Sequence, residues 1–316
     1  VYHREDAIYP FTVVSRPPAE DSYFGEFIHT IVGDAIQHEI DGVKAVHAVD
    51  ESGVHPLLLA IGSERYVPYG PRVPMEILTQ ANGILGYGQM SLAKYLFITA
   101  TEDAPELDIH DTHAYFKHVL ERIRFEKDLH FQTCTTIDTL DYSSKVLNEG
   151  SKLVIAVAGD KKRELCTSTP TELDLSEIET VSQVDFVMDG ILAFKTDSYS
   201  NDELEIDILK DIRTKLENQD LSQVGIILLC DDSEFISKAH GNFLWATFTR
   251  SNPSHDISGV GEFTDNKHWG CTGPLIIDIR IKPHHAPGLT EDPEAVAEAH
   301  RIINSTPQLK EICKVL

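Results

Sequence analysis

Four apolar runs of strand length constrain the fold of this chain more than any other feature. They are YLFITA (95–100), KLVIAVA (152–158), VGIILLC (224–230) and PLIIDIRI (274–281). A run in which apolar and polar residues do not alternate is typical of a strand that is covered on both faces. The sheet that holds these strands therefore needs a layer of helices on each side.

Helical patterns between the runs supply those layers. Amphipathic spacing predicts helices over 20–37, 74–90 and 203–217, and another that begins at Asp111 or Thr112. Asp292 and Pro293 predict the start of a C-terminal helix, since a capping residue is followed by a first-turn proline. The segments 43–49 and 54–61 flank DESG and predict a hairpin. The pattern as a whole predicts an α/β fold, with a mixed or mostly parallel sheet flanked by helices.

A faint internal repeat accompanies this pattern. YLFITATED is followed by Phe116, Leu120, Arg122 and Asp128, and GIILLCDD is followed by Leu244, Phe248, Arg250 and Asp256, at a constant offset. Two interpretations stay open, a duplicated unit in one sheet or in two similar subdomains, and a coincidence between ordinary βα units. We expect Arg250, in the last turn of a short helix, to pair with Asp256 just beyond it as a structural clasp, and the same spacing at Arg122 and Asp128 favours a packing role.

Composition narrows the classes of function. With 51 acidic and 27 basic residues the net charge is −24, which disfavours nucleic acid and anionic membranes as partners. Five cysteines without a CxxC indicate reduced thiols and a cytoplasmic protein, and Cys230 is expected in the core. No apolar stretch approaches the roughly 20 residues of a membrane span.

The usual site motifs are absent or out of place. Fifteen histidines include no HExxH and no paired CxxC, so ordinary surface or hydrogen-bonded histidines are favoured over a metal site. The glycine-rich GILGYGQ follows a helix and precedes a strand, which is the wrong context for a dinucleotide loop.

Two charged positions remain as candidates. Arg16, Glu20 and Asp21 crowd the end of a short N-terminal strand, Phe11–Val14, and Lys94 directly precedes a buried strand. The structural interpretation of both is a surface ion pair or helix cap worth about 1 kcal/mol or less.

Several of these stretches resemble one known family. YPFTVVSRPPAED, VKAVHAVD, GQMSLAKYLFI and FLWATFTRSNPSHDI are similar to the C-terminal half of UbiD-type decarboxylases, and most similar to the longer members associated with menaquinone synthesis. The resemblance covers residues 1–103 and about 224–290, whereas 104–223 looks like an insertion of the longer members.

The resemblance implies chemistry for the complete protein. It implies a carboxy-lyase that removes CO2 non-oxidatively from an aromatic or α,β-unsaturated acid, with prenylated flavin mononucleotide, manganese or magnesium, and potassium. It also implies that Lys94 faces the cofactor and that Asp21, Tyr23 and Phe24 line the substrate side. No counterpart of the family's Arg-Glu-Glu set or of its metal ligands is found, so no catalytic or metal residue is assigned and this chain alone is expected to bind no cofactor.

The resemblance further implies a division of the chain. Residues 1–40 are expected to form the last strand of an upstream split barrel and a connecting helix, 41–103 the first part of a C-terminal α/β domain, 104–223 an α/β insertion, and 224–316 the remainder. A homo-oligomer is expected. The rival hypotheses are a non-catalytic assembly module and one chain of a two-chain decarboxylase.

Overall fold

The computed structural model describes residues 35–53, 55–176, 178–286 and 292–312. The expected strand at 11–14 and the first part of the expected helix at 20–37 lie outside these residues, although residues 35–39 are helical. The described chain divides into two units, with the division between His285 and Ala286.

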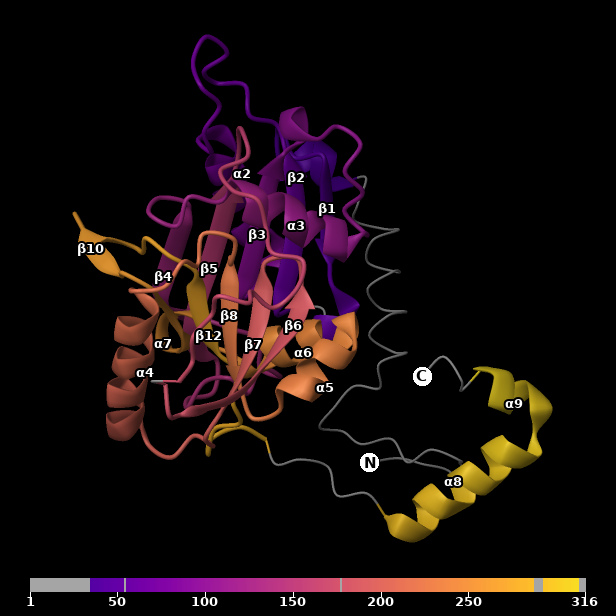
Figure 1. Cartoon of the computed structure of the whole chain (residues 1–316). Coiled ribbons are helices and arrows are strands. Elements are labelled where there is room, and N and C mark those ends of the chain that lie inside the picture. Colours follow the sequence, from indigo (N-terminus) through magenta and orange to yellow (C-terminus); the bar gives the residue numbers. More distant parts are fainter. Residues whose placement is uncertain (1–34, 54, 177, 287–291, 313–316) are drawn as a thin grey trace. The chain divides into compact units, whose positions relative to one another are not determined.

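The first unit contains two five-stranded sheets (Figure 1). The first sheet has the order β1-β2-β3-β5-β4, with bounds β1 (Ala45–Ala48), β2 (Leu57–Gly62), β3 (Tyr95–Ala100), β4 (Leu129–Thr136) and β5 (Glu149–Val157). The second has the order β6-β7-β8-β12-β9, with bounds β6 (Val181–Met188), β7 (Ile191–Thr196), β8 (Ile226–Cys230), β9 (Ile257–Gly259) and β12 (Leu275–Asp278). A small hairpin, β10 (Phe263–Asp265) and β11 (His268–Gly270), forms a separate two-stranded sheet, and Trp269 of β11 packs on Phe131 of β4.

Both sheets have the same pairing pattern. In each, the first two strands are antiparallel, the next two pairs are parallel, and the last pair is antiparallel. All four apolar runs form strands that pair in parallel, and β2, β3, β8 and β12 are buried along their whole length. The prediction of a mixed sheet covered by helices is confirmed, but the chain builds two such sheets.

Helices cover each sheet on its two faces. Their bounds are α2 (Glu76–Leu85), α3 (Thr112–Arg122), α4 (Asp202–Leu216), α5 (Ser233–Lys238), α6 (His240–Arg250) and α7 (Pro253–Asp256). One core cluster joins α3 and α6 to a face of each sheet, through residues such as Leu59, Phe116, Leu228 and Phe248. Ile77 of α2 packs on the other face of the first sheet, and Ile212 of α4 on the other face of the second.

The two halves of this unit are repeats. Helices α3 and α6 have equal length, and each bound of α6 lies 128 residues after its counterpart in α3. The same offset relates the starts of β4 and β9. The hydroxyl of Thr112 hydrogen-bonds Nε2 of His240, its counterpart, over 2.8 Å, so the helices meet at equivalent positions. The structure therefore supports a duplication, as two similar subdomains with one sheet each.

The duplication changes the view of residues 104–223. This segment supplies β4 and β5 to the first sheet and β6 and β7 to the second, so it has no sheet of its own. The boundaries of an insertion at residues 104 and 223 stay a prediction. The boundary between the two sheets lies elsewhere in the sequence, in the connection between β5 and β6.

The second unit consists of α8 (Pro293–Ser305) and α9 (Pro307–Ile312). The predicted cap is confirmed, because Asp292 accepts hydrogen bonds from the backbone N–H groups of Glu294 and Ala295. No residue of α8 is buried.

Candidate functional site

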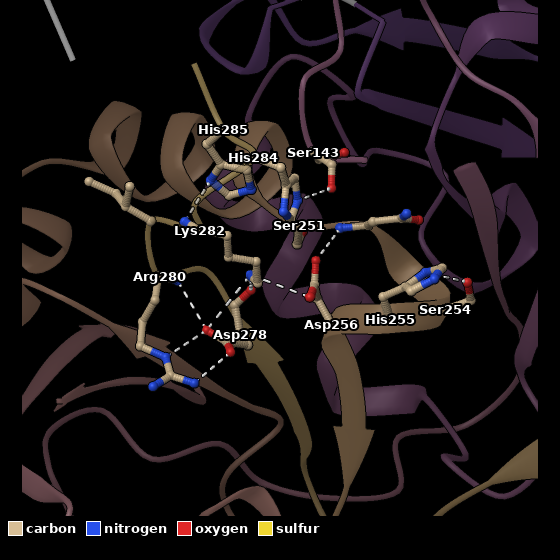
Figure 2. Close-up of polar contacts among 12 residues, drawn as sticks. Ser143, Ser251, Ser254, His255, Asp256, Asp278, Arg280, Lys282, His284 and His285 are labelled. Atoms are coloured by element: carbon tan, nitrogen blue, oxygen red, sulfur yellow. Dashed lines mark hydrogen bonds and ion pairs between the residues drawn. The ribbon is translucent and has the colours of Figure 1, made fainter. Parts of the chain in front are cut away.

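Buried ions gather where β12 ends. The guanidinium of Arg280 donates two parallel hydrogen bonds to the Asp278 carboxylate, from Nε to Oδ1 over 2.9 Å and from Nη2 to Oδ2 over 2.7 Å (Figure 2). The Arg280 side chain is 1% exposed. Burial opposes the charge of Asp278, but the bonds from Arg280 and the charge of Lys282 outweigh it and lower the pKa of this carboxyl.

Lys282 connects the pair of Asp278 and Arg280 to Asp256 in α7. Its Nζ lies 3.3 Å from Oδ1 of Asp256 and donates to the backbone carbonyl of Asp278 over 3.0 Å (Figure 2). The other oxygen of Asp256 accepts from the backbone N–H of Asn252 over 2.7 Å. Burial raises the pKa of Asp256, against the opposing effect of the Lys282 charge.

Lys94 belongs to the same region. It is 1% exposed, its Nζ lies 2.7 Å from Oδ2 of Asp141, and it donates to the hydroxyl of Ser143 over 2.8 Å. The carbonyl of Ser143 in turn accepts from Nε2 of His284, which follows β12 (Figure 2). Lys94 does lie at the entrance of β3, as expected, but the interpretation as a surface ion pair is wrong, because both charges are removed from water.

A second lysine lies beside the first. Lys152 of β5 donates to the backbone carbonyls of Ser91 and Ala93, each over 2.8 Å. Burial lowers the pKa of Lys152 to about 8, with the charge of Lys94 acting in the same direction and Asp141 opposing it. Burial also lowers the pKa of Lys94, and Asp141 is again the main opposing group.

A cavity of about 790 Å³ opens against this cluster. Its polar floor includes Ser143, Asn252, Asp256, Asp278, Lys282 and His284, and its walls include Val146, Tyr199, Ile206, Leu209 and residues 133–136. The volume suits a small organic molecule. Tyr199 follows β7 and Asp278 ends β12, whereas Glu149 and Gly150 begin β5. The second sheet therefore presents to the cavity the carboxyl ends of parallel strands, where open α/β sheets bind ligands, while the first sheet presents the amino end of β5.

The first repeat shows which of these charges the fold requires. Phe97 of β3 pairs with Ile155 of β5 in the first sheet, and Leu228 of β8 pairs with Ile277 of β12 in the second. Counting along β5 and β12 from these pairs makes Ala156 the counterpart of Asp278. In the same way, Ala158 is the counterpart of Arg280. Both alanines are buried in a sheet of the same design. The fold therefore tolerates small apolar residues where the second repeat holds a buried ion pair.

The same comparison applies to Lys94. The N–H of Leu153 bonds the carbonyl of Lys94, and the N–H of Leu275 bonds the carbonyl of Gly225, so Gly225 is the counterpart of Lys94. By contrast, Asp128 and Asp256 are alike, since each accepts from the backbone N–H four residues before it. Asp256 is thus shared by both repeats, whereas Lys94, Asp278 and Arg280 each occur in only one.

The expected pair of Arg250 and Asp256 is wrong. Arg250 stacks over the ring of Trp245, with its guanidinium carbon 4.8 Å from the ring centroid. Asp256 binds Lys282 and caps its own turn instead. The first repeat differs as well, since Asp128 pairs with Arg124 and not with Arg122.

The remaining sequence candidates are placed as follows. Asp21, Tyr23 and Phe24, together with Arg16 and Glu20, lie outside the described residues. The expected core position of Cys230 is confirmed. Within the described ranges, no group of three or more His, Cys, Asp or Glu side chains is arranged to hold a metal ion, and no described helix is long and apolar enough to cross a membrane.

Sequence reasoning missed Asp278, Arg280, Lys282 and Asp141. A signal for the first two was available, because they interrupt the apolar run PLIIDIRI near its carboxyl end. A charge inside such a run needs a buried partner. Asp141 gave no comparable signal, because it lies in a polar connection.

Comparison with known proteins defines the class of the chain. Residues 22–157 match the family model described as the 3-octaprenyl-4-hydroxybenzoate carboxy-lyase C-terminal domain, UbiD_C. This part of the chain therefore carries a UbiD-type C-terminal domain, and the resemblance seen in the sequence is confirmed.

Particular relatives are bacterial. A protein of Chlamydia pneumoniae that is named as a 4-hydroxybenzoate decarboxylase subunit is 31% identical over 93% of this chain and 46% of its own length. An uncharacterised protein of Chlamydia trachomatis is 32% identical over 90% of this chain and 45% of its own length. The chain thus spans about half the length of these curated relatives.

Solved structures of the same class match less of the chain. The vanillic acid decarboxylase of Sedimentibacter hydroxybenzoicus, in its closed form, is 14% identical with a TM-score of 0.34, over 45% of this chain and 28% of that one. A UbiD-class enzyme from Pelotomaculum thermopropionicum, in complex with FMN, is 16% identical with a TM-score of 0.33, over 48% and 28%.

Proposed function

We propose that this chain is the C-terminal portion of a UbiD-like carboxy-lyase that non-oxidatively decarboxylates an aromatic or α,β-unsaturated acid of the quinone-precursor type. The UbiD-type C-terminal domain supports the decarboxylase class. The observation that carries the proposal to named residues is the buried cluster of Lys94, Asp278 and Arg280, whose counterparts in the other repeat are Gly225, Ala156 and Ala158. Buried charges that the fold does not require are candidates for a functional role.

The described residues fit only part of the cofactor that the family implies. Lys94 is the proposed group on the cofactor side, but no described set of side chains suits the family's metal ion. When bound, prenylated flavin supplies the electron sink for the carbanion that loss of CO2 leaves. The contribution of this chain is a cation held in a fixed position, a wall that excludes water, and, as proposals, substrate contacts at Asp21, Tyr23 and Phe24.

The proposal is tested by assaying the complete protein for CO2 release from aromatic acids. Lys94→Met is expected to lower kcat/KM by a factor of about 100 or more, as for loss of a fixed charge at a reacting group. The matched control is Asp128→Asn, which disturbs a buried ion pair of the first repeat outside the cavity. Equal loss of activity in both variants at matched stability would remove Lys94 from the site.

This chain alone is expected to bind no prenylated flavin. The reason is that the described residues offer no metal site for the cofactor phosphate. Titration of the chain with prenylated flavin mononucleotide and manganese, followed in the visible spectrum, checks this. Saturable binding at micromolar cofactor would show that this chain holds the cofactor site.

The second candidate function is one chain of a two-chain decarboxylase. The relative from C. pneumoniae is named as a subunit of a decarboxylase, and the chain spans about half of that relative. The mass of the native protein decides between these candidates. A native chain near 35.3 kDa that co-purifies with a flavin-binding chain supports the two-chain form, and one near 35.3 kDa without such a partner supports an assembly module. A homo-oligomer in the cytoplasm stays a prediction.

A further inference from the structure

The ammonium group of Lys94 is held by one short stretch of the 137–148 loop, which connects β4 to β5. Its Nζ lies 2.7 Å from Oδ2 of Asp141 and donates to the Ser143 hydroxyl over 2.8 Å. The hydroxyl and the backbone N–H of Ser143 both donate to Oδ1 of Asp141, over 2.5 Å and 2.9 Å. An ammonium group has three N–H donors. Asp141 and Ser143 direct two of them, which fixes the direction of the third.

Apolar packing does little to hold the middle of this loop. Four of its large apolar side chains are exposed, namely Leu140, Tyr142, Val146 and Leu147. Its two ends are held by polar contacts, since Asp138 pairs with His55 and Nδ2 of Asn148 donates to the Thr139 hydroxyl over 2.8 Å. The middle of the loop therefore depends on further polar contacts for its position.

The second repeat supplies such a contact. Nε2 of His284 lies 3.3 Å from the carbonyl oxygen of Ser143 (Figure 2). A carbonyl oxygen only accepts, so Nε2 carries the proton and donates it. His284 follows β12, so this hydrogen bond joins the two repeats beside the Lys94 ammonium. Counting on from Ala156 and Asp278 makes Lys162 the counterpart of His284, and Lys162 is exposed. The imidazole, like Lys94, thus occurs in one repeat and not in the other.

A second set of contacts holds the strands around Lys94 against the second repeat. The hydroxyl of Tyr95, which begins β3, shares a hydrogen bond of 2.6 Å with the Ser251 hydroxyl. The hydroxyl of Ser151 in β5 accepts from the backbone N–H of Ser254 over 2.8 Å. Tyr95, Ser151 and Ser251 are each at most 1% exposed. The strands that flank Lys94 and the segment between α6 and α7 are therefore tied together by buried hydrogen bonds.

We propose that His284 is a positioning residue, which donates to the Ser143 carbonyl and thereby holds the 137–148 loop where Asp141 and Ser143 direct the Lys94 ammonium. The second repeat thus has a role in the site of the first. The effect of this positioning on decarboxylation rests on the proposed function of Lys94, whereas the positioning itself does not.

The first experiment measures how often the loop leaves Lys94. Lysines of the complete protein are acetylated under native conditions, and mass spectrometry gives the rate at Lys94 relative to the exposed Lys127. His284→Phe keeps a planar ring but removes the donor. It is expected to raise the relative rate at Lys94 about 2- to 10-fold, because one hydrogen bond no longer opposes opening of the loop. His284→Gln, whose side chain again carries an N–H donor, is expected to restore most of the protection.

The chain offers a matched control. Thr112→Val removes the hydrogen bond between Thr112 and His240, which also joins the repeats but lies at the starts of α3 and α6. It is expected to leave the relative rate at Lys94 unchanged. An unchanged rate in His284→Phe, or an equal rise in Thr112→Val, would overturn the proposal.

The second experiment keeps this proposal separate from the proposed function. In CO2 release by the complete protein, His284→Phe is expected to lower kcat about tenfold at nearly constant KM, because a small misplacement of a fixed charge slows the reaction, and His284→Gln is expected to recover most of it. Loss of activity in Lys94→Met with full activity in His284→Phe would contradict the positioning role. Full activity of Lys94→Met would contradict the proposed function instead, and the acetylation rates would then decide on His284 by themselves.

Discussion

At the scale of single residues, Lys94 and Asp141 form an ion pair in which both side chains are buried. Removing one partner is expected to lower the stability of the fold strongly, whereas replacing both with apolar side chains is expected to lower it little. Lys94→Met leaves the Asp141 carboxylate buried without its cation, and is expected to reduce the free energy of unfolding by about 3–5 kcal/mol. The double variant Lys94→Met with Asp141→Leu removes both charges, so it is expected to recover most of this loss. Urea unfolding of both single variants and the double variant measures the coupling. A double variant whose loss equals the sum of the two single losses would show that the ion pair contributes nothing.

A second residue-scale prediction separates Arg250 from Asp256. Arg250 lies over Trp245, a ring that is 44% exposed, so Arg250→Ala is expected to cost about 0.5–1 kcal/mol. Asp256→Ala leaves the Lys282 ammonium with the more distant Asp278 carboxylate, 3.9 Å away, and the Asn252 N–H without its acceptor, and is expected to cost about 3 kcal/mol. Thermal melts of both variants give the order. If Arg250→Ala were the more damaging change, the contact with Trp245 would not explain the role of Arg250.

At the scale of elements, the repeats give two versions of one helix with different caps. Asp111 accepts a hydrogen bond from the N–H of Ala114 at the start of α3, while Ala239 offers no side-chain cap at the start of α6. Asp111→Ala is therefore expected to cost about 1 kcal/mol. Ala239 has the extended backbone of a capping residue, so Ala239→Ser is expected to add about 0.5–1 kcal/mol. Chemical denaturation of both variants tests the pair, and a loss of stability in Ala239→Ser would show that the hydroxyl is not tolerated where α5 meets α6.

At the scale of the whole molecule, buried histidines set a lower limit of pH for stability. Burial lowers the pKa of His118 to about 4, and burial and neighbouring cations lower that of His285 to about 3. The unfolded chain binds protons at these groups near pH 6.5 and the folded chain does not, so stability is expected to fall as the pH drops from about 6.5 toward 4. Urea unfolding between pH 7.5 and 5 measures this slope. His118→Asn is expected to reduce it, and NMR titration should find both imidazoles neutral at pH 5; a protonated His118 in the folded chain at that pH would contradict the account.

The pH response has a structural reason at His118. Its Nε2 shares a hydrogen bond of 2.9 Å with the hydroxyl of Thr99 inside the first sheet's helical layer. The neutral imidazole therefore has a hydrogen-bond partner. Protonation would place a buried positive charge on a ring whose described hydrogen bond is to a hydroxyl and not to a carboxylate. The melting temperature of the His118→Asn variant at pH 7.5 reports how much this bond contributes.

Sequence reasoning predicted the elements of this molecule better than their assembly. The apolar runs at 95–100 and 224–230 identified central strands, because burial on both faces leaves a direct compositional signal. The existence of two sheets was only hinted at by the offset between Arg122 and Arg250. The candidate site was harder to predict than the strands. Lys94 and Asp141 are far apart in the sequence, and no sequence pattern indicates that a residue before a strand will pair with a residue in a distant loop.

The error at Arg250 also has a physical cause. A spacing of six residues suggested contact with Asp256, but α6 ends at Arg250 and the chain then becomes extended at Ser251. The Asp256 carboxylate instead turns back to the N–H of Asn252, at the start of its own short helix. Local backbone donors thus competed successfully with the side-chain partner that spacing alone predicted.

The contact between Thr112 and His240 has a consequence for how such a chain can diverge. Two similar halves that meet at equivalent helix starts form, in effect, a dimer whose two members are tethered by a peptide link. A short link keeps partners at an effective concentration on the order of millimolar, so their interface needs far less affinity than one between free molecules. Neither half then has to match the other residue by residue, and either half can acquire a charge in its interior at a position where the other keeps alanine or glycine.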